Sequence, residues 1–176
     1  MRYEGWYGYG RPQNLDQFEV VKLVNASMGI RAAFALDEQG IYGFVGGGSG
    51  VYGTLLKPGH SYLYVLGLLN SRLLDFYFQR ISSRFRGGFY VYRPQYVGQL
   101  PIRRIDFDNP EEKKMHDDLA ALVGRMLELN RRLKDAVGRE REELERKIER
   151  TDREIDELVY RLYGLTEEEI AVVEGK

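Results

Sequence analysis

The clearest hydrophobic pattern lies in the last third of the 176-residue chain. Apolar residues recur at alternating spacings of four and three over residues 115–133, and again over residues 144–162. This spacing predicts helices that pack along a coiled-coil seam. Gly138 lies between the two runs and favours a turn, which would give an antiparallel hairpin. The heptad stays in phase across Gly138, so one long helix of about 80 Å is the alternative.

Local signals mark where these helices begin. Asn109 can cap a helix that has Pro110 in its first turn and Glu112 three residues after the cap. Thr166 and Glu169 form a capping box that predicts a short final helix. Residues 111–113 read E-E-K and contain the E-x-K fragment of a nuclease motif. That motif needs acids on adjacent strands, so we interpret these residues as the start of a helix.

The front of the chain shows shorter and more varied patterns. Strand-like content predicts strands over residues 18–24, 31–36, 41–45, 50–56 and 89–92. Leucines at helical spacing predict one helix over residues 62–70 and a second over residues 71–81, which either continues the first or is set off from it at Asn70 and Ser71. The predicted fold is therefore α+β, with a mixed α/β domain over residues 1–107. A C-terminal α-helical coiled-coil hairpin is predicted over residues 108–176.

The charge is distributed unevenly, although the net charge is −1. Residues 57–104 hold eight basic residues and one acid, Asp75, whereas residues 105–176 carry a net charge of −7. A basic region beside an acidic tail predicts a directed contact with a polyanion. The alternative is that the basic region docks on the acidic tail.

The composition limits which metal sites and catalytic groups the chain could contain. The chain has no cysteine and two histidines, His60 and His116, far apart in sequence. We therefore predict neither a metal site nor catalytic residues. No apolar run is long enough to span a bilayer, and the first residues do not form a signal peptide. We expect a cytoplasmic protein with no membrane partner.

The segment ISSRFRGGFYVYRPQ, residues 81–95, is the strongest candidate for a binding surface. Its arginines can bind phosphates or guanine edges, and its glycine pair permits a tight turn and a close backbone approach. Its alternating aromatic residues let one face join the core while the other forms a contact surface. The candidate contacts here are Arg84, Phe85, Arg86, Gly87, Gly88, Tyr92 and Arg93.

Two further stretches add candidates. The first, WYGYGRPQ at residues 6–13, offers Tyr9, Arg11 and Gln13, with a strand or arm packed on the core as the alternative. The second is a glycine-rich loop over residues 43–53, which adds Ser49, with Lys57 shortly after it. Strand-like residues follow these glycines, whereas a phosphate-binding or adenosylmethionine-binding loop needs a helix there. We therefore interpret the glycines as a hairpin loop.

Several motifs in order resemble a known family. They are LNS at residues 69–71, FRGG at residues 85–88, QLPI at residues 99–102 and the ending IDELVYRLYGLTEEEI at residues 155–170. Together they resemble the TaqI-like C-terminal specificity domain of prokaryotic adenine-specific DNA methyltransferases and fused type IIG restriction-modification enzymes. The resemblance implies a target-recognition domain for double-stranded DNA.

The same resemblance implies partners and cofactors outside this chain. The parent enzyme would supply a catalytic methyltransferase domain or subunit with S-adenosylmethionine, and in fused forms a nuclease that uses Mg²⁺. We expect no cofactor in this chain, because neither an adenosylmethionine loop nor an Asn-Pro-Pro-aromatic motif occurs in it. One alternative is a stand-alone type I-like specificity subunit that forms a homodimer through its coiled coil and recruits methylase subunits. Another is a small-molecule methyltransferase fragment that uses the glycine loop.

Overall fold

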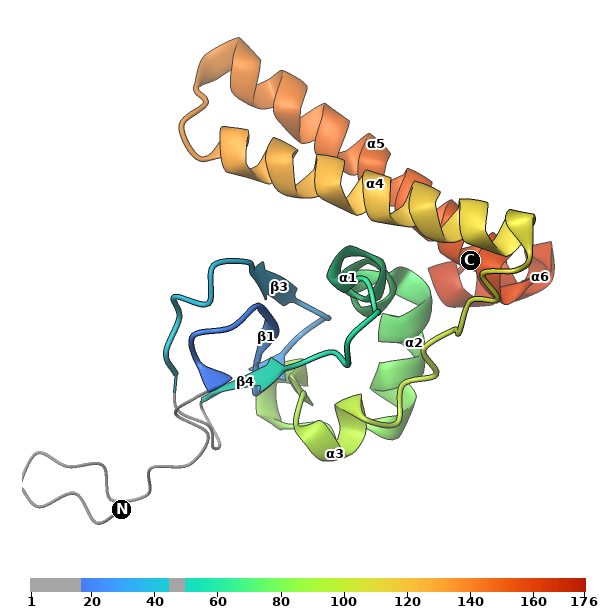
Figure 1. Ribbon diagram of the computed structural model, residues 1–176, viewed down its shortest axis with the longest axis horizontal. Coiled ribbons are helices and arrows are strands. Elements are labelled where there is room, and N and C mark those ends of the chain that lie inside the picture. Colours follow the sequence, from blue (N-terminus) through green and yellow to red (C-terminus); the bar gives the residue numbers. More distant parts are fainter. Residues whose placement is uncertain (1–16, 45–49) are drawn as a thin grey trace, which may run out of the picture.

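The computed structural model describes residues 17–44 and 50–176, and it has the predicted α+β class (Figure 1). A three-stranded antiparallel sheet has the order β3-β1-β4, and a small second sheet pairs β2 with β5. The strands are β1 (Lys22–Ala26), β2 (Met28–Gly29), β3 (Phe34–Asp37), β4 (Val51–Thr54) and β5 (Tyr90–Val91). The predicted strands near residues 18–24, 31–36, 50–56 and 89–92 are thus found with shifted or shorter bounds.

Two helices follow the sheet, and one serine separates them. Helix α1 (Tyr62–Asn70) ends where α2 (Arg72–Ile81) begins, so the second of the two predicted alternatives, separate helices, is found. The Ser71 hydroxyl donates to the Leu68 carbonyl at 2.7 Å and accepts from the Leu74 amide at 3.3 Å. Ser71 therefore closes one helix and caps the next, which sets the second helix off in a new direction.

The remaining helices include a long antiparallel pair. The remaining helices are the short η2 (Arg86–Gly88) and α3 (Pro94–Val97), the long α4 (Pro110–Leu133) and α5 (Gly138–Tyr163), and the final α6 (Glu167–Glu174). Helices α4 and α5 pack side by side and are joined by residues 134–137, so the hairpin is found rather than one long helix (Figure 1). No helix in the described part of the chain is long and apolar enough to cross a membrane.

The predicted caps of these helices are present. The Asn109 side chain accepts hydrogen bonds from the Glu111 and Glu112 amides at the start of α4. Thr166 and Glu169 form the reciprocal capping box of α6. Glu112 has a different role from a capping box, since its carboxylate accepts from the Asp106 amide and pairs with Arg103. It ties the preceding loop to the helix.

One hydrophobic core joins the two halves of the chain. Helix α1 lies between the sheet and the hairpin, and its Gly67 lets it approach α4 closely (Figure 1). The buried residues from α1 and α2 are Tyr64, Leu66, Leu68, Leu69, Leu74 and Phe78, and those from α4 and α5 are Leu119, Val123, Ile155, Leu158, Val159 and Leu162. Hydrophobic burial therefore fixes the sheet, the paired helices and the base of the hairpin together.

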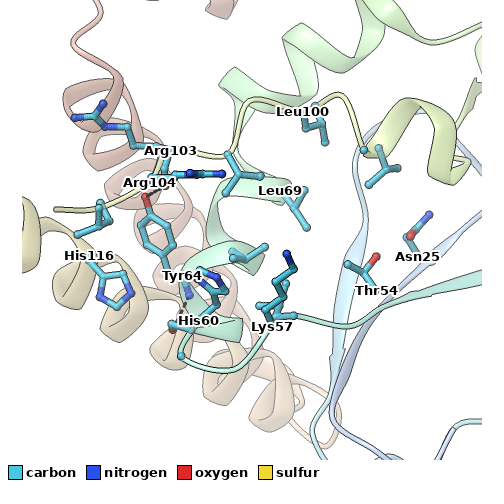
Figure 2. A pocket seen from close by; sticks show the side chains of 18 of the residues that line it. Asn25, Thr54, Lys57, His60, Tyr64, Leu69, Leu100, Arg103, Arg104 and His116 are labelled. Carbon is cyan, nitrogen blue, oxygen red and sulfur yellow. Dashed lines mark hydrogen bonds between the residues drawn. The ribbon is translucent and has the colours of Figure 1, made fainter. Parts of the chain in front are cut away.

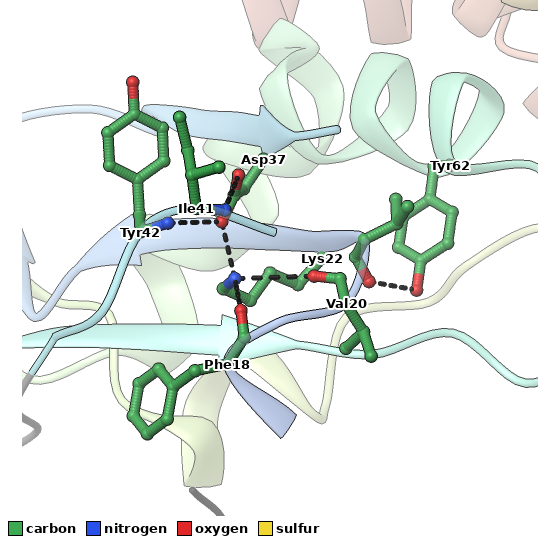
Figure 3. A network of polar contacts seen from close by, with 8 residues as sticks. Phe18, Val20, Lys22, Asp37, Ile41, Tyr42 and Tyr62 are labelled. Carbon is green, nitrogen blue, oxygen red and sulfur yellow. Dashed lines mark hydrogen bonds and ion pairs between the residues drawn. The ribbon is translucent and has the colours of Figure 1, made fainter. Parts of the chain in front are cut away.

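A buried ion pair organises the outer edge of the sheet (Figure 3). Lys22 and Asp37 face each other across β1 and β3, and their charged atoms are 2.5 Å apart with both side chains almost fully buried. The Lys22 ammonium also donates to the Phe18 carbonyl at 2.5 Å. Asp37 accepts from the Ile41 and Tyr42 amides at 3.1 Å each. Each charge thus has several partners, which buried charges require.

This network explains why the prediction of a strand over residues 41–45 is wrong for residues 41–44. The amides of Ile41 and Tyr42 donate to the Asp37 carboxylate and not to a neighbouring strand, and residues 41–44 form no strand. Strand β4 pairs instead with β1, so the predicted hairpin, in which residues 41–45 and 50–56 pair across the glycine-rich loop, is wrong for the described residues 41–44. The apolar pattern of residues 41–45 could not indicate that the Asp37 side chain would bind these backbone amides.

Candidate nucleic-acid interface

The candidate binding segment forms a tight turn between α2 and α3, which we call the arginine turn (residues 84–93). Gly87 and Gly88 have φ of 79° and 81°, a region that residues with a Cβ rarely adopt. The Phe85 amide donates to the Phe89 carbonyl at 2.7 Å and closes the turn. The predicted use of the glycine pair for a tight turn is confirmed.

The turn is anchored to α2 at its base. The Ser82 hydroxyl accepts from the Val91 amide and donates to the Val91 carbonyl, both at 3.0 Å. Arg84 pairs with Tyr90 in an isolated β-bridge, and its guanidinium lies 5.6 Å from the Tyr90 ring centroid. The arginine turn is therefore a fixed loop rather than a loose connection.

The tip of the arginine turn presents charge and an aromatic ring to solvent. Arg84, Phe85, Arg86, Gly87, Gly88 and Arg93 are all exposed, and Phe85 is 58% exposed. Within the described residues, no carboxylate forms an ion pair with Arg84, Arg86 or Arg93. These guanidinium groups are available for an anionic partner.

Tyr92 does not belong to this exposed set, and the prediction that it contacts DNA is corrected. The side chain is 3% exposed, and its ring stacks on Phe78 with centroids 4.1 Å apart. Its hydroxyl donates to Asp75 at 2.8 Å, and burial raises the pKa of this hydroxyl above its ordinary value. Tyr90 and Tyr92 lie on the buried face, and Tyr92 joins the turn to α2 through its contacts with Phe78 and Asp75.

The single acid of the basic region points inward as well. Asp75 accepts hydrogen bonds from the Ala32 amide at 2.8 Å, the Tyr92 hydroxyl and the Gln79 side chain. Its charge is therefore used to connect α2, the turn and the segment before β3. It does not neutralise the exposed arginines.

A cleft of about 1040 Å³ lies among the segment after β4, helix α1, helix α3 and the loop between α3 and α4 (Figure 2). Lys57 and His60 lie on the side formed by the segment after β4, and Arg103 and Arg104 lie on the loop between α3 and α4. Helix α3, which Arg93 precedes as N-cap, contributes Pro94 and Val97 to the lining. None of the described residues that line the cleft is acidic. We call it the basic cleft.

The predicted residues therefore divide among several places. The exposed residues of the arginine turn are Arg84, Phe85, Arg86, Gly87 and Gly88, with Arg93 at its end as the N-cap of α3, and Lys57 lies in the basic cleft. Tyr9, Arg11, Gln13 and Ser49 lie outside the described residues. Sequence reasoning did not identify His60, Arg103 or Arg104, because the cleft is built from segments that are distant along the chain. The one available signal was that residues 57–104 hold eight basic residues and a single acid.

Comparison with known proteins identifies the family. The sequence model of one protein family, the TaqI-like C-terminal specificity domain, matches residues 6–102, which is more than half of the chain. The chain belongs to this family. The match includes the arginine turn and most of the basic cleft, whereas Arg103, Arg104 and the hairpin lie beyond it.

A curated relative extends the similarity to the helices. The chain is 27% identical over 175 residues to the type II restriction enzyme and methyltransferase RM.Eco57I of Escherichia coli. The alignment covers 96% of this chain and 17% of that protein. The chain thus spans about one sixth of the relative's length, and the similar region includes the long helical hairpin.

Proposed function

We propose that this chain is the DNA target-recognition part of a restriction-modification enzyme of the adenine-methylating type. The observation that carries the proposal is the arginine turn, a rigid loop of exposed arginines within a TaqI-like specificity domain. Arginine forks can bond the O6 and N7 atoms of guanine in the major groove, and other basic residues can hold the phosphates. The turn offers both kinds of contact.

The proposal assigns methyl transfer, and any DNA cleavage, to other parts of the parent protein. S-adenosylmethionine and, for cleavage, Mg²⁺ would be held there. The described residues contain no cluster of three or more His, Asp or Glu side chains suited to a metal. Titration of the purified chain with S-adenosylmethionine in a calorimeter tests this assignment, and clear binding would instead favour a methyltransferase fragment.

Selection from a randomised duplex library tests sequence recognition directly. The purified chain is incubated with the library at low and at physiological salt, and the bound pool is sequenced. A short motif that stays enriched at the higher salt supports the proposal, because non-specific phosphate binding falls steeply with salt. Binding that disappears with salt and enriches no motif contradicts it.

The variant Arg86→Ala tests the arginine turn. If Arg86 contacts a base, the loss of that contact weakens binding to the selected site by about 1–3 kcal/mol and relaxes preference at one position. Arg139→Ala is a matched control, because it removes the same charge from an exposed position at the far end of the hairpin. Equal affinity and selectivity in parent and Arg86→Ala would remove Arg86 from the interface.

A further inference from the structure

The basic cleft has two kinds of lining that a plain phosphate site does not need. Its rim carries Lys57, His60 and Arg104, and much of its interior is apolar, including Leu56, Val65, Leu69, Val97, Leu100 and Ile105. A cleft of about 1040 Å³ is as large as pockets that enclose small organic ligands, roughly 300–1,000 Å³. Its ligand must therefore combine negative charge with apolar surface.

The cations of the cleft differ in their availability. Arg103 pairs with Glu112 at 2.8 Å, so its charge is already balanced. Lys57 and Arg104 are exposed, and no ion pair engages either of them in the described part of the chain. Figure 2 shows these two side chains on different segments that line the cleft, so each offers a cation to an anion that enters it.

An exposed aromatic ring lies at the same cleft. Phe107 is 54% exposed and Ile102 is 37% exposed, although both are large apolar side chains. The Phe107 ring meets His116 edge-on, with centroids 5.1 Å apart, and His116 packs against Tyr64 at 4.6 Å. One side of the Phe107 ring therefore contacts His116, while much of its remaining surface is exposed to solvent.

The wall behind this ring is fixed by hydrogen bonds. The Tyr64 hydroxyl donates to the Arg103 carbonyl at 3.0 Å, and the Arg103 amide donates to the Tyr163 hydroxyl at 3.1 Å. The Tyr163 hydroxyl also donates to the Pro101 carbonyl at 2.6 Å. The loop over residues 101–107 is therefore attached to α1 and α5, and Phe107 and Arg104 are presented from a constrained backbone.

We propose that the basic cleft binds one unpaired nucleotide of a DNA strand, with its base against Phe107 and its phosphate between Lys57 and Arg104. A base is flat and apolar on its faces, and its phosphate is anionic, which matches the two linings. Aromatic platforms beside cationic grooves bind single strands without strong sequence preference. The proposal extends the proposed function, and it adds a site separate from the arginine turn.

Binding of a short single strand to the full chain tests the cleft. Fluorescence anisotropy follows a labelled oligothymidine of about five nucleotides, within the known range of site sizes. Phe107→Ala is expected to weaken binding about 5- to 150-fold, the effect of losing one stacked base. Phe107→Tyr keeps a ring and should bind like the parent, whereas Phe107→Leu keeps the apolar bulk and should bind weakly.

Two variants that each remove one arginine charge distinguish a phosphate contact in the cleft from non-specific attraction between the chain and DNA. Arg104→Ala should weaken oligothymidine binding and make it less dependent on salt, because one phosphate contact is lost. Arg139→Ala removes the same charge from the distant hairpin end and should leave binding close to that of the parent. If Phe107→Ala and Arg104→Ala bind oligothymidine as the parent does, or if Arg139→Ala weakens it equally, the cleft proposal is wrong.

Two measurements keep this proposal distinct from the proposed function. Arg86→Ala should reduce selection of a duplex motif but leave oligothymidine binding unchanged. Enrichment of a duplex motif together with unaltered oligothymidine binding in the cleft variants would overturn the cleft proposal alone. If no duplex motif is enriched but the Phe107 series behaves as expected, the cleft proposal stands without sequence recognition.

Discussion

At the residue scale, two buried carboxyl groups respond differently to their surroundings. Burial alone raises the pKa of Asp37, but hydrogen bonds from Lys22 and from the Tyr42 and Ile41 amides outweigh it and lower the pKa. Burial raises the pKa of Asp156 to about 6, although the Arg72 amide donates to it at 2.9 Å and the Arg72 guanidinium pairs with it at 3.0 Å. The nearby charges of Asp152 and Glu174 add to that increase. Three donors outweigh burial at Asp37, whereas at Asp156 burial and the nearby acids outweigh the amide and guanidinium of Arg72.

Asp156→Asn should therefore change how stability depends on pH. The carboxyl of Asp156 has an ordinary pKa of 3.8 when unfolded and about 6 when folded, so between these values the folded chain binds more protons. Its contribution to stability is present at low pH and is lost as the pH rises through about 6. Asparagine keeps an acceptor for the Arg72 amide and removes this slope.

Urea unfolding at several values between about pH 4 and pH 6 measures the effect. The unfolding free energy of Asp156→Asn should fall less with rising pH than that of the parent. Glu157→Gln is the control, since it removes one carboxylate from an exposed position beside Asp156. Identical pH slopes in the parent and Asp156→Asn would show that this carboxyl does not titrate as proposed.

The aromatic residues of the arginine turn show what sequence could predict at this scale. Alternation correctly placed Tyr90 and Tyr92 on one face and Phe89 and Val91 on the other. It could not tell which face is buried, because Phe78 and Asp75 decide that from another segment. Tyr92 was therefore assigned to the wrong surface, although the turn itself was predicted correctly.

At the element scale, two glycines test how closely α1 packs against α4. A Cβ on Gly67 would lie 2.8 Å from Val123 Cγ2 and 3.1 Å from Leu119 Cδ1, so the core would have to move. Gly124 has more room, since its nearest such neighbour is Leu63 Cδ1 at 3.9 Å. The same substitution should therefore have opposite effects at the two positions.

Gly124→Ala should stabilise the chain by about 1 kcal/mol, the usual gain in helix propensity. Gly67→Ala should destabilise the chain. The added methyl group overpacks the core at a cost of about 1–3 kcal/mol, which exceeds the gain in helix propensity. Urea unfolding of both variants beside the parent measures this difference. Equal stabilisation by the two substitutions would mean that α1 and α4 are not packed this tightly.

The elements predicted best were those with local signals. Helices α1, α2, α4, α5 and α6 have periodic apolar residues, and most have a capping side chain close in sequence. The strands depend on partners far along the chain. The predicted strand is absent over residues 41–44, where the Asp37 carboxylate accepts from the Ile41 and Tyr42 amides. The basic cleft was missed for the same reason, since sequence proximity does not reveal segments that meet in space.

At the scale of the whole molecule, the hairpin is both a core component and a projection. Its base contributes Leu119, Val123, Leu158 and Val159 to the main core beneath α1. Its far end has a smaller cluster of Leu129, Ala136 and Leu144, with Leu133 and Ile148 against it. The division at residue 107 remains a prediction about function, because packing is continuous across it. The shared core holds the arginine turn and the basic cleft in one frame.

The same packing predicts that the chain is a monomer. A coiled-coil dimer needs a free apolar stripe, but the seam of α4 faces α5 within the chain and buries Leu129 and Leu144. Sedimentation velocity over a range of micromolar concentrations should give one species with the monomer mass of 20.4 kDa. A stable dimer would contradict this and favour the type I-like specificity subunit. If Leu127→Glu, at a partly exposed position on α4, then dissociated that dimer, the outer face of the hairpin would be its interface.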